Sequence, residues 1–144
     1  MSHGSIPAAL RRLVVERAGG RCEYCFLHQD DTALSHHIDH IIPLKHGGQP
    51  VSENLALACL QCNRRKGSDL TSIDPIDKAI VPLFNPRSQV WEEHFMLEGA
   101  QITGQTAVGR ATVALLRLNE HTRIIQRQLL MDASRYPLSS ESGS

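Results

Sequence analysis

The segment HHIDHIIP, residues 36–43, places three histidines and one aspartate within five positions. Imidazole titrates near neutral pH and can accept a proton or bind a metal ion, and carboxylate oxygen is a ligand of hard cations. These residue types therefore predict proton transfer, metal binding or both, unless the cluster arose by chance. The surrounding sequence must show whether the cluster is a functional site or a chance occurrence.

All four cysteines fall in two CxxC pairs, Cys22–Cys25 and Cys59–Cys62. Two residues between thiolates allow a tight turn to direct both sulfurs at one ion, and four thiolates complete the tetrahedron that zinc prefers. We therefore predict a structural zinc site with four cysteine ligands. The alternatives are reduced core cysteines and a redox dithiol, although a redox dithiol needs only one such pair, usually on a βαβ unit that this sequence does not suggest.

The spacing between the two pairs is informative. Residues 26–58, a stretch of 33 residues, separate them, whereas a plain zinc ribbon has about 15–20 residues there. A metal ion bound by both pairs would hold the ends of this long segment together, and HHIDHIIP lies within the segment. A zinc ion with four thiolates has no open position for chemistry, so its predicted role is structural, with a folding contribution on the order of 10 kcal/mol.

Composition sets the broad class of the protein. The 144 residues suggest one folded domain, and 15 basic residues balance 15 acidic ones, so net charge points to no partner and any nucleic-acid contact must depend on local charge. The sequence has no apolar run long enough to span a membrane and no signal peptide at its start. We therefore expect a cytoplasmic protein without a membrane partner, where thiols stay reduced.

The expected secondary structure is mixed, and the predicted fold class is α+β. The expected elements are a helix over 6–18 capped by Ser5, a strand over 36–42, a strand over 55–58, a helix from Cys62, an irregular Pro-rich stretch over 73–90, a hairpin over 91–105 turning near Glu98–Gly99, a helix from Thr106 and a helix over 120–132.

Three segments follow from this reading. Residues 1–72 would hold the N-terminal helix and the zinc-closed module, and residues 73–135 would form a C-terminal extension packed on it. Residues 136–144, which end in SSESGS, would be a disordered tail. In the last helix, Arg123 and Arg127 are most simply interpreted as a solvated face.

The combined motifs resemble the HNH endonuclease family in its zinc-clasped ββα-metal (His-Me finger) form. The segments that carry the resemblance are CEYC, HHIDHIIPLKHGG, ENLALACLQCN and RRKG, all within residues 22–67. The later part also looks like the C-terminal extension of a bacterial subgroup of HNH proteins, which brings the resemblance to about residues 8–132. It implies a small ββα-metal core with an N-terminal helix and a C-terminal hairpin plus helices.

The resemblance also implies roles for four residues. His40 matches the general base of the family, and Asp39 and Asn63 match its metal-ligand positions. Asn54 matches the middle Asn, which braces the loop that bears the base. The last position of the motif is often His, and Asn63 there makes the site rich in oxygen, which favours Mg²⁺ or Mn²⁺.

Each of these residues also has a purely structural interpretation. His40 would then be hydrogen-bonded within a small core, Asp39 would orient a histidine, and Asn63 would cap a helix. The roles of His36 and His37 stay undecided. Strand alternation places His36 on the face of His40, whereas His37 either supports the metal site, contacts phosphate or is a partly exposed polar residue.

A short basic run follows the second cysteine pair. Helices of this type can lie along a groove and contact phosphates, so five side chains are candidate DNA contacts: Lys45, His46, Arg64, Arg65 and Lys66. The alternative is a solvated helix face and loop. A nuclease of this size that cuts both strands often needs two copies. The C-terminal hairpin and helices would provide a homodimer interface, or substrate specificity, or only part of the core.

These observations predict a metal-dependent endonuclease that hydrolyses DNA, by nicking or double-strand cleavage, with His40 as general base. The rival hypothesis is a noncatalytic zinc module that binds nucleic acid or protein. Such a module would use the same cysteines but has no need of Asp39, His40, Asn54 and Asn63 together.

Overall fold

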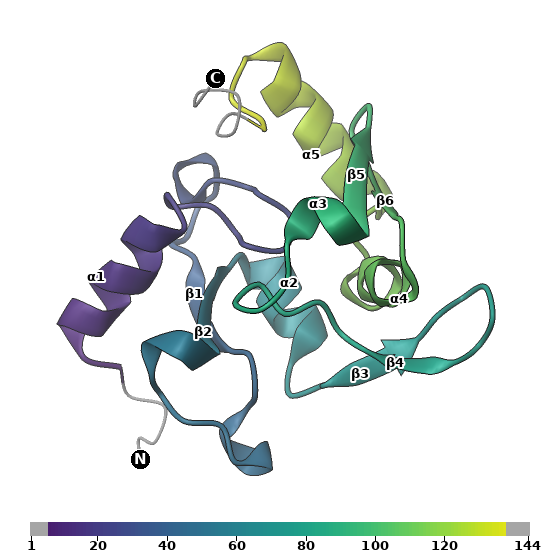
Figure 1. The fold of residues 1–144 in the computed structure, drawn as a ribbon. Coiled ribbons are helices and arrows are strands. Elements are labelled where there is room, and N and C mark those ends of the chain that lie inside the picture. Colours follow the sequence, from purple (N-terminus) through teal and green to yellow (C-terminus); the bar gives the residue numbers. More distant parts are fainter. Residues whose placement is uncertain (1–5, 138–144) are drawn as a thin grey trace.

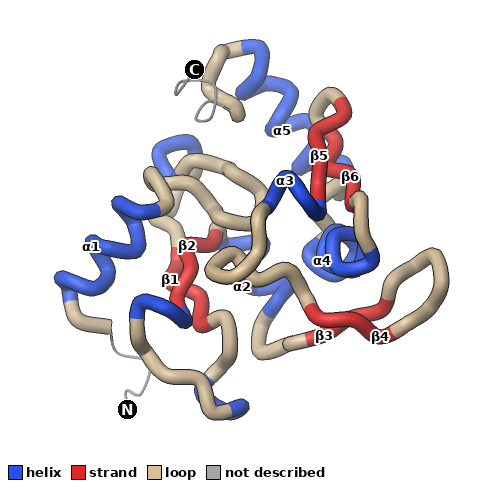
Figure 2. Tube along the Cα trace, in the orientation of Figure 1, coloured by secondary structure: helices blue, strands red, loops and turns tan. Residues whose placement is uncertain are grey.

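The computed structural model describes residues 6–137 and has the predicted α+β architecture (Figure 1). Its helices and strands are, in order, α1 (Ala8–Arg17), β1 (His37–His40), β2 (Leu55–Ala58), α2 (Leu60–Lys66), β3 (Thr71–Ile73), β4 (Ile80–Pro82), α3 (Trp91–His94), β5 (Phe95–Glu98), β6 (Gln101–Gly104), α4 (Ala107–Leu116) and α5 (His121–Asp132). The strands form three separate two-stranded antiparallel sheets (Figure 2).

The first sheet and α2 form the ββα unit that the motifs predicted. β1 pairs with β2 in a register that places His40 opposite Leu55 and Asp39 opposite Ala56. Every residue of β2 is buried, because α1 covers one side, where Val14 packs with Leu55, and α2 follows directly on the other (Figure 1). The pairing with this buried strand fixes the position of β1, and therefore of the histidine segment.

The expected N-terminal helix is present as α1. Pro7 precedes its first turn, and the chain leaves it through Gly19 and Gly20, whose φ angles of 64° and 74° favour glycine. Ser5, the predicted cap, lies outside the described residues. The helix turns the chain directly into the first cysteine pair.

The C-terminal half contains one hairpin more than the sequence suggested. The stretch over 73–90 was expected to be irregular, but β3 and β4 form a short hairpin at its start. The expected hairpin over 91–105 begins with the helical turn α3, and β5 then pairs with β6 across a turn at Gly99. The expected helices after it are α4, capped by Thr106, and α5.

One core joins the two halves. The four cysteines and Tyr24 belong to the same buried cluster as Phe84, Trp91 and Phe95. The ring centroids of Trp91 and Phe95 lie 5.0 Å apart, and those of Phe84 and Phe95 lie 5.2 Å apart. Residues after 73 therefore help to bury the cysteine cluster.

The chain end was predicted to be disordered from residue 136. Tyr136 is buried, and its hydroxyl donates a hydrogen bond of 2.7 Å to the carbonyl of Cys25. Residues 138–144 lie outside the described part. Within residues 6–137, no helix has the length and apolar character needed to cross a membrane.

Candidate active site and metal centre

The two cysteine pairs converge on one point. The sulfurs of Cys22, Cys25, Cys59 and Cys62 all lie within 4.8 Å of one another, are buried and form no disulfide. The sulfurs of Cys25 and Cys59 are 3.8 Å apart, which is close to the edge of a tetrahedron with zinc–sulfur bonds of about 2.3 Å. The donor set and its spacing are therefore consistent with the predicted structural zinc.

Local turns position the two pairs. Phe26, directly after the first pair, has a φ of 67°, and the amide of Cys22 donates to the carbonyl of Leu27. At the second pair the sulfur of Cys59 accepts a hydrogen bond of 3.4 Å from the amide of Cys62 and is the N-cap of α2. The second cysteine pair thus stands at the start of α2, the helix that carries Asn63.

Arg123 contacts the cysteine cluster directly. Its Nη2 lies 3.1 Å from the sulfur of Cys62 and 3.7 Å from that of Cys59. Burial by itself would lower the pKa of Arg123, but the neighbouring sulfurs raise it above its ordinary value. The solvated face expected for Arg123 and Arg127 is wrong, because both side chains are buried and bonded.

Asp39 is held by two partners that the motifs did not identify. The hydroxyl of Tyr24 donates to its carboxylate over 2.8 Å, and the ammonium of Lys66 lies 3.3 Å from the same oxygen. Burial raises the pKa of Asp39, although Lys66 and Tyr24 act in the opposite direction. Tyr24 stands between the first two cysteines, so the metal centre and Asp39 are linked through one side chain.

Lys66 does not have the location expected of a DNA contact. Its side chain is 3% exposed, and its ammonium also donates to the carbonyls of His40 and Ile41, over 3.3 Å and 3.2 Å. A side chain that is fully engaged inside the fold is not available to a phosphate on the surface. The predicted contact is therefore corrected: Lys66 ties α2 to the end of β1.

A surface hollow brings three predicted site residues together. Asp39, His40 and Asn63 line it together with four neighbours, and its volume is about 350 Å³. The neighbours are Ile38, Pro43, Leu44 and Gly67. An imidazole, a carboxylate and a side-chain amide therefore line the same hollow. Asn63 lies inside α2, and the cap of that helix is Cys59, so Asn63 does not serve as the N-cap.

The imidazoles of the segment differ in their environment. His36 is buried, and its Nε2 lies 2.7 Å from the carbonyl of Leu27, so its role is structural; burial lowers its pKa despite that hydrogen bond. His37 and His40 are half-buried, and the Nε2 atoms of both are shielded from solvent with no hydrogen-bond partner within the described chain. His40 thus keeps one ring nitrogen uncommitted at the edge of the hollow.

Asn54 connects the two sides of the loop after β1. Its Oδ1 accepts a hydrogen bond from the amide of Ile42, and its Nδ2 donates to the carbonyls of Ile42 and Gln49, all between 2.9 and 3.0 Å. Gly48 allows this packing, because a Cβ atom there would lie 1.6 Å from the carbonyl oxygen of Ile42. These bonds begin two residues after His40.

The remaining predicted DNA contacts are near the surface. Lys45, His46 and Arg64 are exposed. Arg65 is half-buried and lies 3.4 Å from the carboxylate of Glu120, at the start of α5. The exposed basic side chains are neighbours in sequence of residues that line the hollow: Lys45 and His46 follow Leu44, and Arg64 follows Asn63.

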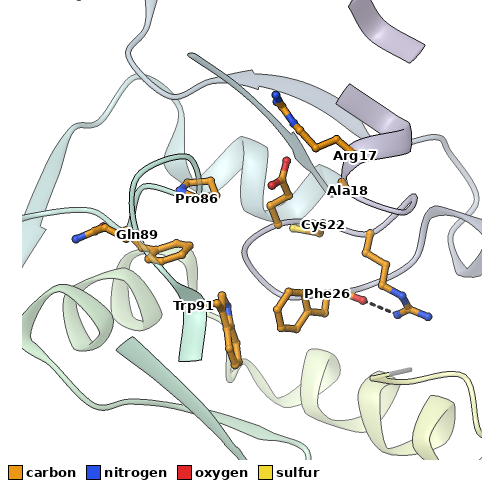
Figure 3. A pocket seen from close by; sticks show the side chains of 10 residues that line it. Arg17, Ala18, Cys22, Phe26, Pro86, Gln89 and Trp91 are labelled. Atoms are coloured by element: carbon orange, nitrogen blue, oxygen red, sulfur yellow. Dashed lines mark hydrogen bonds between the residues drawn. The ribbon is translucent and has the colours of Figure 1, made fainter. Parts of the chain in front are cut away.

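A second hollow of about 240 Å³ lies beside the first cysteine pair (Figure 3). Phe26 and Trp91 form part of its wall, with ring centroids 4.5 Å apart. Arg21 donates to the carbonyl of Phe26, and Arg17 donates to the carbonyl of Leu55. None of the predicted catalytic residues lines this hollow. Arg17 ties α1 to β2, and Arg21 holds the turn after the first cysteine pair.

Sequence reasoning missed the structural roles of Tyr24, Lys66 and Arg123. Two of these had a signal. Tyr24 lies between two metal-ligand cysteines, and Lys66 follows Asn63 by three residues, which places both on one side of a helix. Arg123 had no such signal, because its partner is more than sixty residues away in the chain.

Comparisons with known proteins bear on the same segment. The model of the HNH endonuclease family matches residues 22–69. The chain is 23% identical over 124 residues to the Septu protein PtuB of Bacillus thuringiensis, covering 85% of this chain and 46% of that protein. The chain thus spans about half the length of this curated relative. No solved structure matches it. The family match indicates a function of nuclease type.

Proposed function

We propose that this chain is a metal-dependent nuclease that hydrolyses phosphodiester bonds in DNA, a proposal that the match of residues 22–69 to the HNH endonuclease family supports. The observation that carries the proposal is the hollow in which His40, Asp39 and Asn63 meet. A general base and two oxygen ligands are the groups that such a hydrolysis needs in one place.

His40 acts as the general base in this proposal. Imidazole has an ordinary pKa near neutrality, so a neutral ring can take a proton from the attacking water at physiological pH. The Nε2 atom of His40 has no hydrogen-bond partner among the described residues. Lys66 and Asn54 fix the backbone on both sides of the base through the carbonyls of His40 and Ile42.

Asp39 and Asn63 would hold the divalent ion, Mg²⁺ or Mn²⁺. Such an ion, when bound, stabilises the negative charge that develops on the phosphate oxygens. Asp39 supplies a carboxylate oxygen and Asn63 a neutral amide oxygen, which are donors that hard cations accept. Tyr24 and Lys66 orient the carboxylate before any substrate arrives.

Zinc would occupy the cysteine cluster as a structural ion. Four buried sulfurs leave no position for water, so the cluster takes no part in the hydrolysis. Its effect is positional: Cys62 precedes Asn63 directly, and Tyr24 between the first two cysteines bonds to Asp39. Both proposed ligands of the divalent ion are therefore connected to the zinc centre, Asn63 through the backbone and Asp39 through the hydrogen bond from Tyr24.

DNA would be bound through its backbone. The side chains of Lys45, His46 and Arg64 are exposed, directly follow hollow-lining residues in the sequence, and suit phosphate contacts. Arg65 would contribute less, because Glu120 already pairs with it. The balanced net charge predicts weak and salt-sensitive binding.

Cleavage of supercoiled plasmid tests this proposal. The purified protein is incubated with plasmid in EDTA, Mg²⁺ or Mn²⁺, and the nicked and linear forms are separated on a gel. We expect cutting with Mg²⁺ or Mn²⁺ and none in EDTA. Binding of DNA without cutting in any metal would favour the noncatalytic zinc module instead.

A further inference from the structure

We propose that Arg123 is the resident counter-charge of the zinc centre, and that its guanidinium slows the release of the metal by holding the thiolates of Cys62 and Cys59. The inference rests on the proposed zinc ion. It assigns to α5, which lies outside the matched segment 22–69, a part in the metal centre of that domain.

The geometry singles out this side chain. Arg123 lies on α5, sixty-one residues after Cys62, and its Nη2 is 3.1 Å from that sulfur. The same nitrogen is 3.7 Å from the sulfur of Cys59. Both cysteines belong to the second pair, the one that begins α2, so a single guanidinium bridges α5 and the start of the helix with Asn63.

Charge explains why an arginine is present there. Four thiolates around one divalent ion carry excess negative charge, and a buried charge is costly unless an opposite charge lies close to it. Arg123 is 4% exposed, and among the ion pairs of residues 6–137 no carboxylate pairs with it. Thiolates bound to zinc would be its anionic partners, so Arg123 and the metal-bound sulfurs would compensate one another.

Two other residues of the C-terminal half hold the first cysteine pair without touching sulfur. The indole nitrogen of Trp91 donates to the carbonyl of Tyr24 over 3.0 Å, and the hydroxyl of Tyr136 donates to the carbonyl of Cys25 over 2.7 Å. These bonds fix backbone. Arg123 differs from them because its guanidinium contacts the metal-binding atoms themselves.

Arg127 offers a matched control on the same helix. It lies one turn after Arg123 and is 3% exposed. Its guanidinium donates to the carbonyls of Ala100 and Leu118, both over 2.7 Å, and to Asn119. Arg123 likewise donates to the carbonyl of Leu116 over 2.9 Å. Both arginines therefore support the fold through carbonyls, and only Arg123 contacts sulfur.

The test measures zinc release from the full chain into a chromogenic chelator under native conditions, for wild type, Arg123→Gln, Arg123→Lys and Arg127→Gln. Outer-shell partners of a metal site are typically worth about 10- to 100-fold in affinity. We expect Arg123→Gln to release zinc about 10- to 100-fold faster, and Arg123→Lys to recover part of that loss. Arg127→Gln should lower the melting temperature yet release zinc at nearly the wild-type rate.

Cobalt gives a second readout that a purely structural role would not change. With Co²⁺ in place of zinc, the sulfur-to-metal charge-transfer band reports the thiolates, and we expect it to shift in Arg123→Lys and to stay in Arg127→Gln. Equal release rates and bands in the Arg123 variants and wild type would overturn the proposal, as would equal acceleration in Arg127→Gln. Wild-type protein without zinc would instead overturn the zinc assignment itself. If Arg123→Gln does not fold, the zinc release rate and the cobalt band of Arg123→Lys test the proposal.

Discussion

The ammonium of Lys66 lies 3.3 Å from the carboxylate of Asp39, and both side chains are almost completely buried. The pair joins the last turn of α2 to the strand that carries His40. A carboxylate that is already oriented in this way costs little further ordering when it binds an ion or a substrate. The ion pair also explains why a lysine in a basic run is turned inward while Arg64 remains exposed.

Replacing Lys66 by Met should destabilise the fold and the site together. Removing one partner of a buried ion pair leaves the other uncompensated and typically costs about 3–5 kcal/mol. We expect chemical denaturation to show a loss of that order for Lys66→Met, with metal-dependent cleavage reduced. Arg64→Met, an exposed change on the same helix, should keep the wild-type stability. Equal stability of Lys66→Met and wild type would refute the buried pair.

Substitution of Asn54 should loosen the loop after β1. Asn54→Ala removes an acceptor for Ile42 and two donor contacts, and a group left without its partner costs about 1–3 kcal/mol. We expect lower thermal stability and slower cleavage with zinc content unchanged. Asn54→Asp keeps the acceptor but places a carboxylate oxygen against the carbonyls of Ile42 and Gln49, so it should destabilise the loop at least as much as Asn54→Ala. A wild-type cleavage rate in Asn54→Ala would argue against a brace.

Replacement of Cys59 by serine should destabilise the fold through loss of the zinc ion and not through loss of the helix cap. The sulfur of Cys59 caps α2, and serine is an even better N-cap than most residues. If Cys59→Ser still loses zinc and melts at a much lower temperature, loss of the metal is the reason. Leu60→Ser, at the partly exposed neighbouring position, is the control. Unchanged zinc content and melting temperature in Cys59→Ser would contradict the four-thiolate site.

Phosphate contacts should appear in the salt dependence of DNA binding. Each lost contact reduces the slope of log affinity against log salt by about one. We expect Arg64→Ala and Lys45→Ala each to show this change with catalytically inactive protein and a short duplex. Arg65→Ala should show less, since Arg65 is paired with Glu120. A slope identical to wild type in Arg64→Ala would remove that residue from the interface.

The local elements near the motifs could be predicted well from the sequence. The strand expected over 55–58 coincides with β2, and the strand expected over 36–42 contains β1. The helix expected from Cys62 begins two residues earlier, because a cysteine sulfur takes the place of the usual cap. Turn residues and ligand spacing are local signals, and they were sufficient here.

Long-range partners were the part that could not be predicted. On α5 the apolar Leu129 is 64% exposed while Arg123 is buried, which reverses the usual reading of an amphipathic helix. The reversal follows from acceptors far away in the chain, namely cysteine sulfurs and backbone carbonyls. The hairpin of β3 and β4 was missed for a related reason: Ile80 is 71% exposed and Pro82 closes the strand, so no alternation marked it.

The central claim is that His40 is the base of a metal-dependent nuclease. The most direct measurement is the rate of plasmid cleavage in Mg²⁺ or Mn²⁺ by wild type, His40→Ala and the exposed-histidine control His46→Ala, with zinc content and melting temperature measured for each. We predict a loss of about 10²–10⁴-fold in His40→Ala with the fold intact, and at most a modest, salt-dependent loss in His46→Ala. Cleavage by His40→Ala at the wild-type rate would contradict the account.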